Sequence, residues 1–163
     1  MNVALFGTSA DPPTTGHLEI LRWLSEQFDQ VAVWAADNPF KSHQTPLEHR
    51  TAMLQLLIHD LACPNVRVHP ELSHLRTLIT IERAQERWQG AELTLVVGSD
   101  AARQLPKWFR AAELLQLVKV LVVPRSGYDF QPHDFERLRE LGAEVAIAPI
   151  SVPAVSSTAY REH

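Results

Sequence analysis

Short apolar runs alternate with longer segments of helical periodicity along the whole chain. The apolar runs are residues 2–7, 30–36, 65–70, 93–98, 118–124 and 143–149. The helix-like segments are residues 16–29, 46–61, 77–88, 100–105, 110–117 and 132–142. Runs that are apolar on both faces are typical of parallel strands buried under helices. The pattern therefore predicts an α/β fold: a Rossmann-like doubly wound, mostly parallel sheet of five to six strands with helices on both faces.

Length, charge and cysteine content narrow the class of protein. The 163 residues predict one domain that spans 1–163. Cys63 is the only cysteine, so no internal disulfide can form, and this is compatible with the cytoplasm. A net charge of −4 without a basic block argues against nucleic-acid binding. No apolar run is long enough to span a membrane, and the first residues lack a signal-peptide pattern, so we expect a cytoplasmic protein without a membrane partner.

The first loop carries the residues best suited to hold an anion. The stretch "GTSADPPTTGH" at 7–17 joins the first apolar run to the first helix-like segment. Gly7 permits a sharp turn and the close approach of a ligand. Thr14 and His17 are three residues apart, so at the start of a helix they share one face, where the helix dipole also favours an anion. The alternative is that Thr14 only caps the helix and His17 lies on its surface.

Two signatures give the chain a family resemblance. "TTGH" at 14–17 resembles the T-x-G-H form of the first signature of the nucleotidylyltransferase superfamily, and "SSTAYR" at 156–161 is similar to its S-S-T-x-x-R signature. Between them, residues 38–58, with a P-x-K element and an H-R pair, are similar to a segment of the nicotinate-nucleotide adenylyltransferases. Residues 98–127, with Gly-x-Asp, Lys-Trp and Pro-Arg-x-Gly, are similar to another segment of these enzymes.

The resemblance implies an enzyme that joins AMP from ATP to nicotinate mononucleotide in NAD biosynthesis and releases pyrophosphate. It assigns catalytic contacts with the triphosphate to His17, Thr14 and Arg161. The residues it implies for ATP binding are Gly7, Thr8, Ser9, Gly16, Lys41, Gly98, Asp100, Ser157 and Thr158. The residues it implies for binding the acceptor nucleotide are Thr80, Trp108, Phe109 and Arg125, with Trp108 stacked on the pyridine ring.

The chemistry implied by the resemblance needs charge neutralisation more than a general base. Mg²⁺ would arrive with ATP, and the histidines show no spacing typical of a protein metal site, so we expect none. His49 and Arg50 are expected to orient the helix at 46–61, and Arg50 is also a candidate phosphate contact. The oligomeric state stays open, a homo-oligomer included.

Three positions depart from the family pattern. Ser9 and Ala10 stand where the family has Thr-Phe, and Ile79 stands where it has Asp. The sequence stops two residues after Arg161, where the family continues with a helix, so we expect this chain to be truncated. The alternatives left open are another acceptor (nicotinamide mononucleotide or phosphopantetheine), a cytidylyltransferase, and a nucleotide-binding module without turnover.

Overall fold

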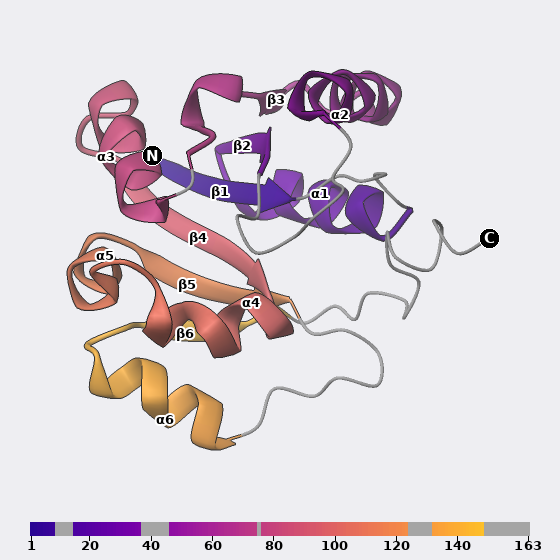
Figure 1. Ribbon diagram of the computed structural model, residues 1–163. Helices are drawn as coiled ribbons and strands as arrows, with labels where there is room; N and C mark the ends of the chain where they lie inside the picture. The colour runs from indigo at the N-terminus through magenta and orange to yellow at the C-terminus, as the bar shows by residue number, and fades with distance from the viewer. Residues whose placement is uncertain (9–14, 37–45, 75, 124–131, 149–163) are drawn as a thin grey trace.

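A parallel sheet forms the centre of the molecule, as predicted (Figure 1). The computed structural model describes residues 1–8, 15–36, 46–74, 76–123 and 132–148. Within these ranges the strands are β1 (Asn2–Thr8), β2 (Gln30–Ala35), β3 (Val66–Val68), β4 (Glu92–Gly98), β5 (Lys119–Val123) and β6 (Val145–Ile147). Their order in the sheet is β3-β2-β1-β4-β5-β6, and every neighbouring pair is parallel. The predicted α/β doubly wound fold is therefore confirmed.

Helices cover both faces of the sheet. They are α1 (Thr15–Gln27), α2 (Leu47–Leu61), α3 (Thr77–Arg87), α4 (Ser99–Gln104), α5 (Ala111–Leu117) and α6 (Pro132–Glu140), with short 3₁₀ helices η1 (Pro70–Leu72) and η2 (Leu105–Lys107). α1 and α2 pack on one face, and α3, α4, α5 and α6 pack on the other. Among the described residues, no helix is both long and apolar enough to cross a membrane.

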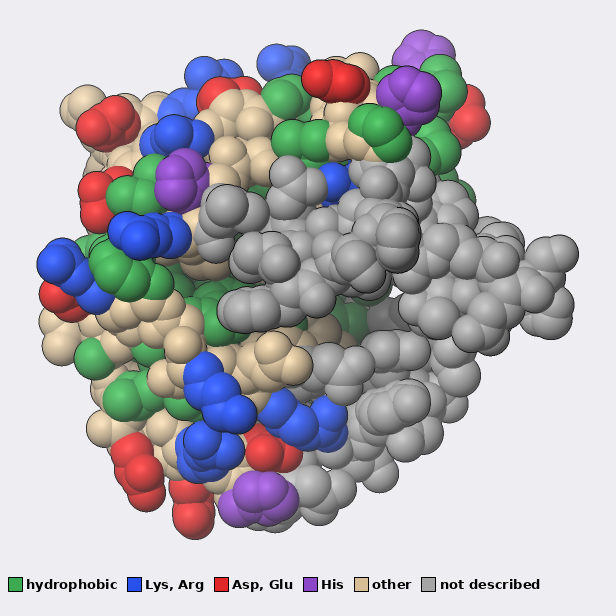
Figure 2. All heavy atoms as spheres, in the orientation of Figure 1, with side chains coloured by type: hydrophobic (Ala, Val, Ile, Leu, Met, Phe, Trp, Pro, Cys, Tyr) green, Lys and Arg blue, Asp and Glu red, His purple; other side chains and the backbone are tan. Residues whose placement is uncertain are grey.

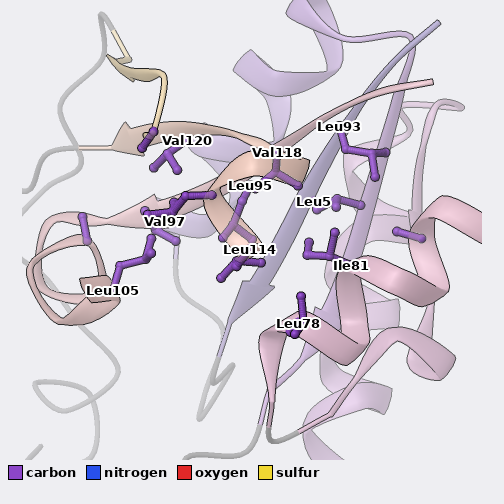
Figure 3. Close-up of a cluster of buried hydrophobic side chains, with 14 of the residues drawn as sticks. Leu5, Leu78, Ile81, Leu93, Leu95, Val97, Leu105, Leu114, Val118 and Val120 are labelled. Atoms are coloured by element: carbon purple, nitrogen blue, oxygen red, sulfur yellow. The ribbon is translucent and has the colours of Figure 1, made fainter. Parts of the chain in front are cut away.

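The strands β1, β2, β4 and β5 divide their side chains between two cores. In β1, Val3 and Leu5 join the core under α3 and α5, while Ala4 and Phe6 join the core under α1 and α2. Figure 3 shows Leu5 in the first core together with leucine, isoleucine and valine side chains from α3, β4, η2, α5 and β5. Because both faces are covered, the central strands read as continuous apolar runs and not as alternating ones.

The predicted strand at 65–70 is shorter in the structure, and proline accounts for the difference. It is paired only over Val66–Val68, and a 3₁₀ helix begins at Pro70, which has no N–H to donate to a ladder. The predicted interruption of the helical region at Pro106 is confirmed, since Pro106 lies in a 3₁₀ turn that separates α4 from α5. Gly142 adopts φ +91 after α6 and donates its N–H to the Arg139 carbonyl, as expected of a helix-ending glycine.

The order of the strands creates one topological switch point. The chain runs from β1 outward to β2 and β3, returns to β4 on the other side of β1, and continues outward to β5 and β6. α1 and α4, which follow β1 and β4, therefore diverge to opposite faces of the sheet. The carboxyl ends of β1 and β4 lie side by side where these helices begin (Figure 1). In open parallel sheets, such a position is where ligands bind.

Candidate functional site

A hydroxyl and an imidazole meet at the carboxyl end of β1. Thr8, the last residue of β1, is buried, and its Oγ1 lies 2.9 Å from Nε2 of His17 in the first turn of α1. The contact ties the end of the central strand to the start of the helix. The ring of Phe6 lies beside the imidazole, with the ring centroids 6.4 Å apart. The sequence predicts that His17 shares one face with Thr14, which lies outside the described residues; the partner that the structure describes for His17 is Thr8.

Burial changes the charge expected of His17. Desolvation lowers the pKa of its imidazole from 6.5 to about 4, because the charged form loses its hydration in this site. At neutral pH the ring is therefore uncharged in the unliganded protein. An uncharged imidazole offers one N–H donor and one acceptor nitrogen, which suits both a hydrogen bond to Thr8 and a polar contact with a ligand.

Gly7 has a role that the sequence analysis missed. The sequence predicted a sharp turn at Gly7, but the chain does not turn there. β1 continues through Thr8, and Gly7 pairs with Trp34 of β2. A Cβ on Gly7 would lie 2.7 Å from two atoms of the Trp34 indole, so only glycine fits beside this ring. Trp34 is buried in the core under α3. In the structure, Gly7 and Trp34 each stand one residue before the end of their strand, a register that the predicted runs 2–7 and 30–36 do not show.

Gly98 differs from Gly7 in its surroundings. It ends β4 and is the N-cap residue of α4, with extended backbone at φ −75 and ψ 169. A Cβ built there would meet no atom of the described residues within 4 Å. Gly98 therefore has room for a methyl group among the described residues, in contrast to Gly7. Asp100 lies in the first turn of α4, two residues beyond Gly98.

The predicted acceptor residues lie on the face covered by α3 and α5. Trp108 follows η2, is half-buried and packs against that core. Its backbone N–H donates to the Leu105 carbonyl. Phe109 is 43% exposed. Thr80 is buried in α3, and its hydroxyl donates to the Leu72 carbonyl at 2.5 Å. The single hydroxyl proton of Thr80 is thus engaged inside the protein and is not directed at a carboxylate.

Arg50 has a larger structural role than the sequence analysis gave it. Its side chain is 1% exposed, and Nη1 donates to the carbonyl of Ala36, directly after β2, at 2.6 Å. The contact fixes α2 to the carboxyl edge of the sheet, which agrees with the expectation that Arg50 orients this helix. A buried cation at this edge adds positive charge beside the end of β2. The signal in the sequence was an arginine on the face that Leu54 and Ile58 also occupy.

Seven predicted site residues lie outside the described part of the chain: Ser9, Thr14, Lys41, Arg125, Ser157, Thr158 and Arg161. Of Gly16, the structure describes the backbone, which lies in the first turn of α1. Within the described ranges, no group of three or more His, Cys, Asp or Glu side chains could hold a metal ion. Lys and Arg side chains on the face in Figure 2 are interspersed with Asp and Glu, among the residues that the figure colours.

A doubly wound sheet with polar groups at its switch point is the architecture of nucleotide-binding α/β proteins. The cytidylyltransferase-like family model matches residues 5–163. The "Probable nicotinate-nucleotide adenylyltransferase" of Synechocystis sp. is 44% identical over 178 residues, which cover 99% of this chain and 88% of the relative. The protein of the same name from Gemmatimonas aurantiaca is 35% identical, over 78% of this chain and 63% of the relative.

A solved structure shares the fold. It is the Plasmodium falciparum nicotinic acid mononucleotide adenylyltransferase complexed with NaAD, with a TM-score of 0.76 and 16% identity, covering 98% of this chain and 78% of that one. The chain therefore belongs to the cytidylyltransferase-like family, within its branch of nicotinate-nucleotide adenylyltransferases.

Proposed function

We propose that this protein transfers the adenylyl group of ATP to nicotinate mononucleotide, giving nicotinate adenine dinucleotide and pyrophosphate, as a step of NAD biosynthesis. Family membership supports the reaction class and the acceptor. The observation that carries the proposal is the Thr8–His17 pair at the end of β1, beside the end of β4 with Gly98. In open parallel sheets, a nucleotide binds at such a switch point between neighbouring strand ends.

The reaction is a displacement at phosphorus. A phosphate oxygen of the mononucleotide attacks the α-phosphorus of ATP, and a new P–O–P bridge forms. The bond from the α-phosphorus to the oxygen bridging to the β-phosphorus breaks, and its electrons leave with pyrophosphate. The attacking phosphate is already an anion at neutral pH, so no general base is required. The protein must align two anions and neutralise the developing charge.

His17 and Thr8 are suited to contacts with the leaving group. The neutral imidazole can donate an N–H to a phosphate oxygen without carrying a permanent charge. The negative charge of a bound triphosphate would raise the pKa of His17, because an anion favours the protonated ring. A hydrogen bond with Thr8 holds the imidazole in place before the nucleotide binds. We assign His17 to the charge that develops on pyrophosphate, with Thr14 and Arg161 as further contacts.

The remaining assignments divide between the two substrates. We propose that the ATP contacts are Gly7, Thr8, Ser9, Gly16, Lys41, Gly98, Asp100, Ser157 and Thr158. At Gly7 the contact would involve the backbone, since the space of a Cβ is taken by Trp34. For the acceptor, we propose that Trp108 stacks on the pyridine ring, with Phe109 and Arg125 nearby. The hydroxyl of Thr80 contributes by holding η1 against α3.

A divalent metal, which we propose to be Mg²⁺, would be bound mainly by the triphosphate. The described residues of the site supply a hydroxyl, an imidazole and backbone groups, and no metal-binding cluster is found in the described ranges. This donor set fits an ion that arrives with ATP and keeps most of its ligands from phosphate and water. Such an ion neutralises phosphate charge during the displacement. We expect this ATP-dependent reaction to take place in the cytoplasm.

A pyrophosphate-release assay tests the proposal. The purified protein is mixed with Mg²⁺, either ATP or CTP, and one acceptor at a time: nicotinate mononucleotide, nicotinamide mononucleotide, phosphopantetheine or none. We expect the fastest release with nicotinate mononucleotide, and a turnover lower by about two orders of magnitude in His17→Ala, as for the loss of a preorganised donor. His59→Ala is the matched control, because His59 is exposed near the end of α2. ATP binding without release for any acceptor would instead indicate a binding module, and release only with CTP would indicate a cytidylyltransferase.

A further inference from the structure

Two guanidinium groups flank the exposed ring of Phe109. The Cζ atom of Arg76 lies 4.2 Å from the ring centroid, and the Cζ atom of Arg110 lies 5.3 Å from it. Both contacts are within the range of cation–π attraction. Neither the family signatures nor the core packing requires this arrangement, since Phe109 is 43% exposed and both arginines lie at the surface.

The two arginines come from different parts of the chain and meet at the ring of Phe109. Arg76 directly precedes α3, and the segment before it is fixed to the sheet by Ser73, whose hydroxyl donates to the Ala35 carbonyl at 2.9 Å. Phe109 lies in the turn between η2 and α5, and that turn follows β4 and α4 in the chain. The Arg76–Phe109 contact thus joins the segment before α3, which is fixed to the end of β2, to the turn before α5, and α3 packs against α5.

The charge of Arg76 is available to a ligand. Within the described ranges, no carboxylate forms an ion pair with Arg76. The charge of Arg110 faces an opposite charge, since its Nη1 lies 3.8 Å from Oε2 of Glu113, and both of these side chains are about 60% exposed. Arg110 also has a left-handed backbone, at φ 50 and ψ 46, which is uncommon outside glycine.

We propose that Arg76, assisted by Arg110, selects an acceptor whose ring carries a carboxylate over one whose ring carries a neutral amide. This inference rests on the proposed function, in which the pyridine ring lies against Trp108, the residue next to Phe109. A carboxylate on that ring would come within several ångströms of both guanidinium groups, whereas an amide of the same shape would gain no charge–charge attraction. For two unit charges about 7 Å apart, Coulomb attraction gives a preference of about 3-fold in bulk water and about 50-fold at the effective dielectric of a protein surface.

The test compares two acceptors that differ only in this group. kcat/KM is measured for nicotinate mononucleotide and for nicotinamide mononucleotide with wild type, Arg76→Met and Arg76→Lys. Methionine keeps an unbranched stem over the ring without the charge, and lysine keeps the charge. We expect Arg76→Met to lower kcat/KM for nicotinate mononucleotide by about 10-fold and to leave the value for nicotinamide mononucleotide unchanged. Arg76→Lys should retain most of the preference, and added salt should reduce the preference of wild type but not that of Arg76→Met.

Arg87→Met is the matched control. Arg87 lies at the other end of α3, is exposed, and covers the ring of Trp88 at 5.4 Å, so its loss removes the same kind of contact away from the proposed site. An equal loss with both acceptors in Arg76→Met, or no loss with either, would overturn the inference. If wild type turns over neither acceptor, the proposed function fails. In that case, calorimetry measures the affinity of wild type and of Arg76→Met for each mononucleotide and still tests the inference. The inference is overturned if the ratio of the two affinities is the same in both proteins, or if neither mononucleotide binds.

Discussion

Protonation of His17 should make the stability of this protein depend on pH. Burial lowers the pKa of His17 to about 4 in the folded protein, whereas the unfolded chain has the ordinary value of 6.5. Between these two pH values, the unfolded state binds a proton that the folded state does not. The free energy of unfolding therefore rises with pH across this window. The contribution of His17 is constant above pH 6.5 and is lost as the pH falls towards 4.

The size of the effect follows from the shift. Each pKa unit corresponds to about 1.4 kcal/mol, so a difference from 6.5 to about 4 changes the free energy of unfolding by about 3 kcal/mol. That is a large fraction of the 5 to 15 kcal/mol by which domains are typically stable, and it is measurable.

Urea unfolding at a series of pH values from 7.5 to 4.5 measures this dependence. Carboxylates also titrate near the lower end, so the informative quantity is the difference between wild type and His17→Asn, which has no titratable ring. We expect the difference in unfolding free energy to change by 2 to 3 kcal/mol over the series, with wild type losing more stability as the pH falls. His59→Asn, altered at an exposed position, should follow wild type. A His17→Asn curve parallel to that of wild type, or an NMR titration of His17 near 6.5, would refute the reasoning.

Three substitutions at the same edge of the sheet give further predictions. Gly7→Ala places a methyl group 2.7 Å from the Trp34 indole and should lower the free energy of unfolding by about 1 to 3 kcal/mol. Adding Trp34→Leu should recover part of this loss, and an undiminished loss from Gly7→Ala in the Trp34→Leu background would contradict the contact. The methyl group added by Gly98→Ala would meet no atom of the described residues, so the free energy of unfolding should change by less than about 0.5 kcal/mol. The KM for ATP should rise, and an unchanged KM would place the nucleotide elsewhere. Thr8→Val leaves a buried nitrogen of His17 without its hydroxyl partner and should cost about 1 to 3 kcal/mol in urea unfolding, a loss that should be absent when His17 is already alanine.

The fold could be predicted from the sequence because the central strands are recognisable as continuous apolar runs. Central runs such as 93–98 and 118–124 are apolar on both faces, and only a sheet covered by helices on both sides buries such segments. The predicted strand at 65–70 is shortened at Pro70, whose local effect depends on hydrogen bonds that the sequence does not specify, whereas the predicted interruption at Pro106 is confirmed. Hydrophobic periodicity predicts which residues are buried more reliably than it predicts the residue at which an element ends.

The candidate site was predictable in its location and less so in its contacts. The order of β1 followed by α1, with His17 in the first turn of α1, agrees with the predicted strand–loop–helix order, whereas the predicted convergence of His17 with Thr14 lies outside the described residues. Its lowered pKa, the fit of Gly7 against Trp34 and the engaged hydroxyl of Thr80 each depend on a neighbour from another element. Such pairings arise from the three-dimensional packing, and one sequence alone does not encode them in a readable pattern. The contact between Arg76 and Phe109 belongs to the same group, since the two residues are far apart in the chain.

The central claim is that the crevice between β1 and β4 directs cleavage between the α- and β-phosphates of ATP, with the acceptor phosphate as nucleophile. Phosphorus NMR of a reaction containing the protein, Mg²⁺, ATP and nicotinate mononucleotide tests it most directly, because every phosphorus species is seen at once. We predict that the mononucleotide and ATP signals fall together, while a dinucleotide P–O–P signal and pyrophosphate appear in equal amounts. Formation of ADP, or of AMP and pyrophosphate without the dinucleotide, would contradict the claim.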